Sequence, residues 1–76
     1  MLKITRPAVI RSVQPVNIHG QTSWDIGFVR LDDPDEELNT ARMGDEAIVG
    51  APLTPGDRVD VDYLVGVVVK LSKLAK

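Results

Sequence analysis

The sequence predicts a mostly β protein: a small five-stranded OB-like or SH3-like barrel with one short helix. Three observations support this prediction. Runs of β-branched residues are separated by turn sequences, HGQTS at 19–23 and PLTPGD at 52–57. The segment 59–71 alternates apolar and polar residues over much of its length. The chain has 76 residues, which is enough for one domain, so we expect residues 1–76 to form a single barrel.

The first strand is expected within AVIRSVQPVNI (8–18), after a short lead-in over residues 1–6. Pro7 restricts Arg6 to extended conformations. Pro15 is expected to interrupt the strand, because proline has no amide proton to donate to a ladder. His19 and Gly20 then open a turn.

The second strand is expected in WDIGFVRLD (24–32). Trp24, Ile26 and Phe28 share one face, but the apolar positions then shift to Val29 and Leu31. A β-bulge beside Gly27 would produce such a shift. The alternative is a strand that is covered on both faces near its end.

The segment DDPDEELNTARMG (32–44) is predicted to be a helix of about two turns. Asp33 suits the N-cap, Pro34 the first helical position, Glu36 the capping box and Gly44 the C-cap. An acidic loop is the competing interpretation. The short sequence EAIVG (46–50) is expected to be a third strand.

Pro55 and Gly56 fit the central positions of a type II turn. Beyond this turn, apolar residues occupy every odd position of the next segment: Val59, Val61, Tyr63, Val65, Val67, Val69 and Leu71. This odd face is expected to form the core. Gly66 marks either a bend in one long strand or a hairpin at Val65–Gly66. The continuity of the odd face favours the long strand, whereas the usual length of roughly 5–6 residues favours two.

Composition excludes several classes of function. Without cysteine there can be no disulfide, zinc–thiolate site or thiol nucleophile, and a reducing cytoplasm is the expected location. No run approaches the roughly 20 apolar residues that span a bilayer, so no membrane partner is expected. The single histidine, His19, has no recognisable catalytic partner, and phosphate-loop, GxSxG and HExxH motifs are absent. We therefore expect a protein that is not an enzyme and needs no cofactor.

Charge is strongly segregated along the chain. Residues 1–31 carry a net +3, residues 32–62 a net −8, and residues 63–76 a net +3. Helix capping and a solvated face account for the acidic cluster at 32–37, so no metal site is expected there. If the first and last strands pair, the basic residues of both ends would form one phosphate-binding surface comprising Arg6, Arg11, Lys70, Lys73 and Lys76.

Two segments carry a resemblance to a known family. GQTSWDIGFVRLDD (20–33) and LTPGDRVDV (53–61) resemble filamentous-phage single-stranded DNA-binding proteins. The resemblance implies an OB-like barrel that dimerises, with Trp24 stacking on a base and Arg11 and Arg30 contacting phosphate. IGFVRLDD with GAPLTPGDRVDVDY is also similar to the OB domain found beside thiolase-type acyl-CoA enzymes, although the cysteine zinc ribbon of those proteins is missing.

Two hypotheses of function follow. In the first, the protein binds single-stranded nucleic acid as a homodimer or higher homo-oligomer, through Trp24, Arg6, Arg11, Arg30, Lys70 and Lys73. In the second, it is a protein-interaction or oligomeric accessory module, whose separate basic and acidic surfaces dock onto a partner.

Overall fold

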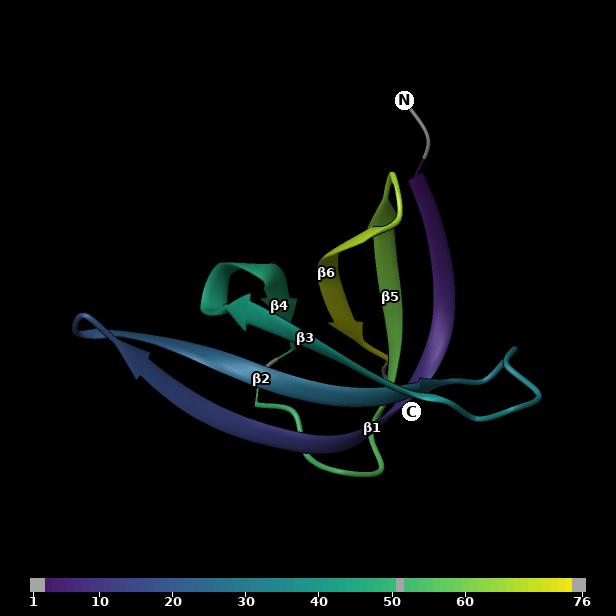
Figure 1. Cartoon of the computed structure of the whole chain (residues 1–76), viewed down its shortest axis with the longest axis horizontal. Coiled ribbons are helices and arrows are strands. Elements are labelled where there is room, and N and C mark those ends of the chain that lie inside the picture. Colours follow the sequence, from purple (N-terminus) through teal and green to yellow (C-terminus); the bar gives the residue numbers. More distant parts are fainter. Residues whose placement is uncertain (1–2, 51, 75–76) are drawn as a thin grey trace.

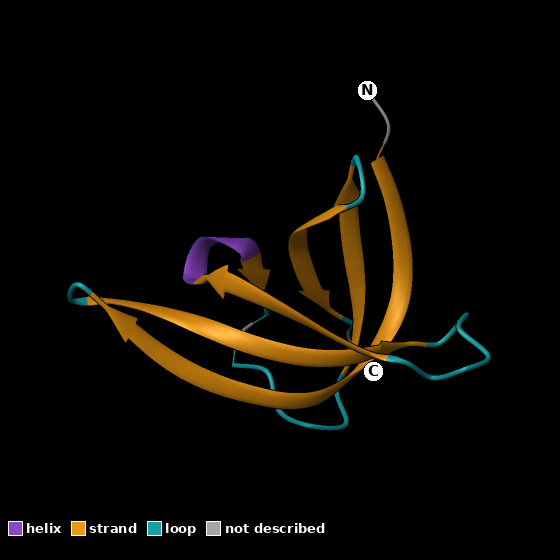
Figure 2. Ribbon diagram, in the orientation of Figure 1, coloured by secondary structure: helices purple, strands orange, loops and turns teal. Residues whose placement is uncertain are grey.

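One six-stranded sheet makes up most of the molecule (Figures 1 and 2). The computed structural model describes residues 3–50 and 52–74. Its elements are β1 (Lys3–Ile18), β2 (Gln21–Arg30), β3 (Leu38–Gly44), the 3-10 helix η1 (Asp45–Ala47), β4 (Ile48–Val49), β5 (Arg58–Leu64) and β6 (Val67–Lys73). The strand order is β3-β2-β1-β5-β6-β4. The mostly β class is confirmed, with six strands instead of five.

The long strand β1 divides the sheet into two arms. Its residues 3–9 pair with β5, and its residues 8–18 pair with β2. Only Ala8 and Val9 have a paired strand on both sides. Figure 1 shows β1 curving between these two stretches, so that β5 and β6 stand with its first half while β2 and β3 lie along its second half. The sheet therefore curls into a half-barrel.

Two details of the first hairpin differ from expectation. Strand β1 begins at Lys3 and continues through Pro7 and Pro15, so the lead-in and the interruption were wrong. In the described residues, β1 is paired around Pro15 with β2 alone, and its other edge carries no strand. A proline whose nitrogen faces an unpaired edge removes no hydrogen bond from the ladder. The bulge lies at Arg11 in β1, between the pairs Ile10–Phe28 and Ser12–Gly27, and not in β2.

Strand β2 is covered on both faces where its apolar pattern shifts. Phe28 and the next residue, Val29, are both buried, as the alternative interpretation required. Gly27 permits close packing there, because a Cβ at this position would lie 2.5 Å from the Ser12 Oγ. Ser12 directly follows the bulge, so the bulge and the glycine form one contact between the strands.

The predicted helix is wrong, and the acidic-loop interpretation holds for residues 32–37. The Asp33 carboxylate does accept backbone hydrogen bonds, from Asp35 N at 3.0 Å and Glu37 N at 3.2 Å. However, Glu36 has φ +51°, which a right-handed helix cannot accommodate. The capping chemistry thus closes a turn, and residues 38–44 pair with β2 as strand β3. Within the described chain, η1 is the one helical segment.

The last apolar segment is a hairpin and not one long strand. Val65 and Gly66 both have positive φ, +51° and +80°, as a type I′ turn requires. A register shift between Asp62 and Tyr63 then places Val68 opposite Tyr63. Consequently Val59, Val61 and Leu71 are buried, whereas Val65, Val67 and Val69 are exposed, and the odd face is not continuous core. The Pro55–Gly56 turn is formed as predicted, with Gly56 at φ +97° and Asp57 N bonded to Thr54 O.

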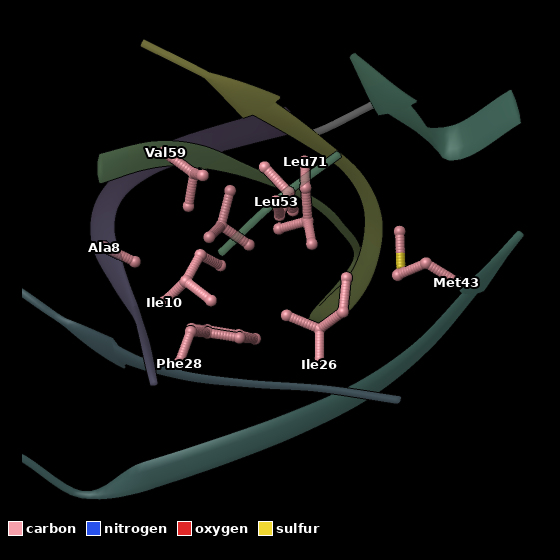
Figure 3. Close-up of a cluster of buried hydrophobic side chains, with 9 residues drawn as sticks. Ala8, Ile10, Ile26, Phe28, Met43, Leu53, Val59 and Leu71 are labelled. Atoms are coloured by element: carbon pink, nitrogen blue, oxygen red, sulfur yellow. The ribbon is translucent and has the colours of Figure 1, made fainter. Parts of the chain in front are cut away.

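The core lies inside the curl of the sheet (Figure 3). It consists of Ala8, Ile10, Ile26, Phe28, Met43, Leu53, Val59, Val61 and Leu71. In the figure Ile10, Phe28 and Ile26 project from one arm toward Val59 and Leu71 of the other. Leu53 enters from the loop before β5, which is held to β1 by the bonds Gly56 N–Ile10 O and Ile10 N–Asp57 O.

Replacing Val65 with asparagine is expected to stabilise the protein. A β-branched residue at positive φ is strained, and asparagine followed by glycine is the preferred type I′ pair. Since the Val65 side chain is 78% exposed, little apolar burial is lost. We expect a gain of about 1 kcal/mol in the free energy of unfolding, measured by urea denaturation. Val67→Asn, at a strand position, serves as control and should give no gain. If Val65→Asn is no more stable than the native protein, the turn is not strained at this position.

Candidate binding site at the open side of the sheet

The free edges of the sheet face each other across one gap, which we call the seam. Among residues 3–50 and 52–74, β3 pairs with β2 alone, so its other edge is free of described strands. Strand β6 is covered by β4 only at Leu71 and Ser72, which leaves the edge of its first residues free in the described chain. Unpaired strand edges carry backbone donors and acceptors that can add another strand.

A groove of about 450 Å³ occupies the seam. Residues Asn39–Arg42 of β3 form one wall, and Gly66–Val68 at the start of β6 form the other. Phe28 and Tyr63 also line the groove. The groove thus combines apolar side chains with two strand edges that have unused hydrogen-bonding groups.

Exposed valines surround the β5–β6 turn. Val65 is 78% exposed, Val67 62% and Val69 41%. Isolated exposed apolar residues are ordinary, but three within one hairpin beside a free strand edge make this hairpin a candidate interaction surface. Charged residues, which commonly protect such edges, are absent between Tyr63 and Val69.

Two arginines gather at the end of the curl, next to the seam, in what we call the arginine cluster: Arg6, Arg30, Asp32 and Tyr63. The Arg30 guanidinium donates two hydrogen bonds to the Asp32 carboxylate, at 2.9 and 3.0 Å. The Arg6 Nε lies 3.7 Å from the same carboxylate. The Arg30 guanidinium carbon lies 5.8 Å from the centre of the Tyr63 ring, within cation–π range.

Asp32 is held ionised by this arrangement. The hydrogen bonds from Arg30, together with its charge and a smaller contribution from Arg6, lower the pKa of the Asp32 carboxyl against the opposing effect of desolvation. The same pair raises the pKa of Arg30. The cluster therefore carries two positive charges and one negative charge near neutral pH.

The predicted basic surface is only partly assembled. The structure brings Arg6 and Arg30 together, but β5 separates β1 from β6, so the first and last strands do not pair. Lys70 lies directly opposite Asp62, and the Lys73 Nζ is 3.5 Å from the Asp57 carboxylate. Arg11 lines a small hollow that Asp33 and Glu36 also line. Lys76 lies outside the described residues.

Trp24 is remote from the arginine cluster. It precedes Arg30 by six residues on β2, a separation of about 20 Å along a strand. Its indole Nε1 donates a 2.6 Å hydrogen bond to the Asp45 carboxylate. The half-buried ring borders an apolar hollow of about 340 Å³ with Val13, Ile48 and Leu53. The nearest charge to the tryptophan is thus negative.

No group of three or more histidine and carboxylate side chains is placed to hold a metal ion among residues 3–50 and 52–74. The same part of the chain has no helix with the length and apolar content needed to cross a membrane. Compared with protein-family models, curated proteins and solved structures, the chain gives no match.

Sequence reasoning missed the seam. Its lining residue Ala41 falls in the segment that was predicted to be a helix, and Val67 was expected in the core. The dipeptide Val65–Gly66 carried a usable signal, because a glycine within a run of β-branched residues fits a tight hairpin. A hairpin at Val65–Gly66 would have indicated that the valines after it, Val67 and Val69, are exposed.

Arg30→Gln is expected to raise the pKa of Asp32 toward its ordinary value near 3.9. Because the pKa is lowered on folding, Asp32 contributes to stability above about pH 4, and this contribution is lost as the pH falls through the folded-state value. Carboxyl NMR titration of the native protein and the variant would measure the shift. The control Arg58→Gln, whose site does not contact Asp32, should leave the titration unchanged; an unshifted Asp32 in Arg30→Gln would disprove the pairing.

Proposed function

We propose that the chain is a small non-enzymatic binding module that receives an extended segment of a protein partner in the seam. The partner strand would add to the free edge of β6 at Val67–Lys70 and place alternate side chains in the groove. Strand addition of this kind obtains affinity from backbone hydrogen bonds and specificity from the side chains facing the pocket. A second copy of this chain is one such partner.

The observation that carries the proposal is the short strand β4. Ile48 and Val49 already pair in parallel with Leu71 and Ser72, so the chain itself fills the adjoining part of this edge. A partner strand would pair with the uncovered residues along the same edge of β6. It would also cover Val67, an apolar side chain that is 62% exposed.

The arrangement of the strands supports an OB-like barrel in preference to an SH3-like one. Strands β1, β2 and β3 follow one another, β5 and β6 form a second hairpin, and the long β1 belongs to both arms. A partly open five-stranded barrel of this kind binds oligonucleotides across its second and third strands in many proteins. Nucleic-acid binding is therefore the second candidate.

The surroundings of the basic residues favour a protein partner over nucleic acid. Among the described residues, five basic side chains form ion pairs with carboxylates: Lys3, Arg6, Arg30, Arg42 and Lys73. The pair between Arg42 and Asp25 lies on the β2–β3 face itself, with the guanidinium 2.8 Å from the carboxylate. Phosphates would have to compete with these carboxylates for the same donors.

Strand addition can be tested with a C-terminally amidated hexapeptide of lysine followed by alternating valine and threonine. In a ¹H–¹⁵N NMR titration, we expect shifts confined to the amides of 39–42 and 66–70, and slower hydrogen exchange at 67–70. Val67→Lys places a charge on the edge and should weaken binding at least about tenfold, with a nearly unchanged melting temperature because Val67 is mostly exposed.

Leu31→Lys is the matched control, since Leu31 is 47% exposed but lies in the loop outside the seam. It should bind the peptide as the native protein does. Shifts spread over other faces, or equal effects of the two variants, would contradict strand addition at β6.

A titration with a 20-nucleotide oligo-dT separates the two candidates. We expect no saturable quenching of Trp24 fluorescence at 20 mM salt, because the indole lies beside Asp45 and not beside a basic track. Saturable quenching that weakens steeply at 150 mM salt would establish nucleic-acid binding instead.

A further inference from the structure

The seam groove adjoins a second hollow that contains the arginine cluster. This hollow measures about 290 Å³ and is lined by Ile4, Arg6, Arg30, Tyr63, Val65 and Gly66. Tyr63 and Gly66 line the seam groove as well. A chain that leaves the seam past Gly66 therefore meets Tyr63 and then the two guanidinium groups.

The second hollow holds an excess of positive charge. The single Asp32 carboxylate engages Arg30 through two hydrogen bonds, whereas its contact with Arg6 is longer, at 3.7 Å. Arg6 thus retains donors that Asp32 does not use. Asp62 lies opposite Thr5, on the other face of the sheet from Arg6, where it accepts a 2.7 Å hydrogen bond from Thr5 and pairs with Lys3.

We infer that the partner segment presents a carboxylate beside an apolar side chain, and that Arg6 binds this carboxylate. The inference rests on the proposed function, because the seam brings the segment to the cluster. A guanidinium binds a carboxylate through charge-assisted hydrogen bonds, and one negative charge would neutralise the net +1 of the cluster. Ile4, Val65 and the ring of Tyr63 supply the apolar wall for the adjacent side chain.

A carboxylate fits this place better than a phosphate of nucleic acid. The groove that leads to the cluster offers strand edges and apolar side chains, including Phe28, Val67 and Val68, which suit a peptide backbone. A segment whose last residue is apolar would place its C-terminal carboxylate at Arg6 and its last side chain against the apolar wall. The second hollow therefore predicts that the partner segment runs along the seam toward Gly66 and that its C-terminus lies beside Arg6.

The test compares two forms of one hexapeptide, lysine followed by alternating valine and threonine and ending in valine, with either a free C-terminal carboxylate or an amide. By NMR titration at pH 7 and low salt, we expect the acid to bind native protein about fivefold more tightly than the amide. Arg6→Gln should reduce this ratio to about one, because the acid loses more affinity than the amide.

Arg58→Gln is the matched control, because it removes an exposed arginine of β5 that does not line either hollow. It should preserve the preference for the acid. Equal binding of the acid and the amide to native protein, or a preference that survives Arg6→Gln, would overturn the carboxylate inference while strand addition stands. Failure of both peptides to bind would overturn the proposed function, and the inference with it.

Discussion

The pairing of one strand with two different neighbours shapes this molecule. Strand β1 exchanges β5 for β2 along its length, and only Ala8 and Val9 are paired on both sides. The two arms diverge at these residues, because β5 pairs with β1 only up to Val9 whereas β2 pairs with β1 from Ala8 to Ile18. Ala8 is fully buried and small, and the bulge at Arg11 adds local twist, so the arms can close over the core. Curling in turn brings β3, at one end of the sheet, and the uncovered edge of β6, near the other end, to opposite sides of one groove.

This constraint explains why binding features gather at the seam. A sheet that closed fully would have no free edges, and a flat sheet would expose its edges on opposite sides. A half-barrel instead places both edges next to each other, together with the apolar residues at the rim of the core. Strand β4, which follows η1, covers the edge of β6 at Leu71 and Ser72, and the start of β6 stays open among the described residues.

Several of the segregated charges pair with one another within the fold. The acidic loop after β2 supplies Asp32 to Arg30 and Arg6, and β2 itself supplies Asp25 to Arg42. Exposed pairs of this kind contribute little to stability, but they decide which cations remain available to a ligand. Net charge along the chain could be counted from the sequence; the pairing could not, because Arg6 and Asp32 meet only after β1 and the end of β2 come together.

The elements that depend on local chemistry could be predicted from residue type and order alone. The turns at His19–Gly20 and Pro55–Gly56, the mostly β composition and the inward side chains of Val59 and Val61 follow from residue type and alternation. Tertiary structure decided the rest. Residues 38–44 carry helix-compatible residues, but pairing with β2 made them a strand, and the register shift after Asp62 turned an apparently continuous apolar face outward. Long-range pairing overrides local preference wherever that preference is weak, and the seam is built from just such segments.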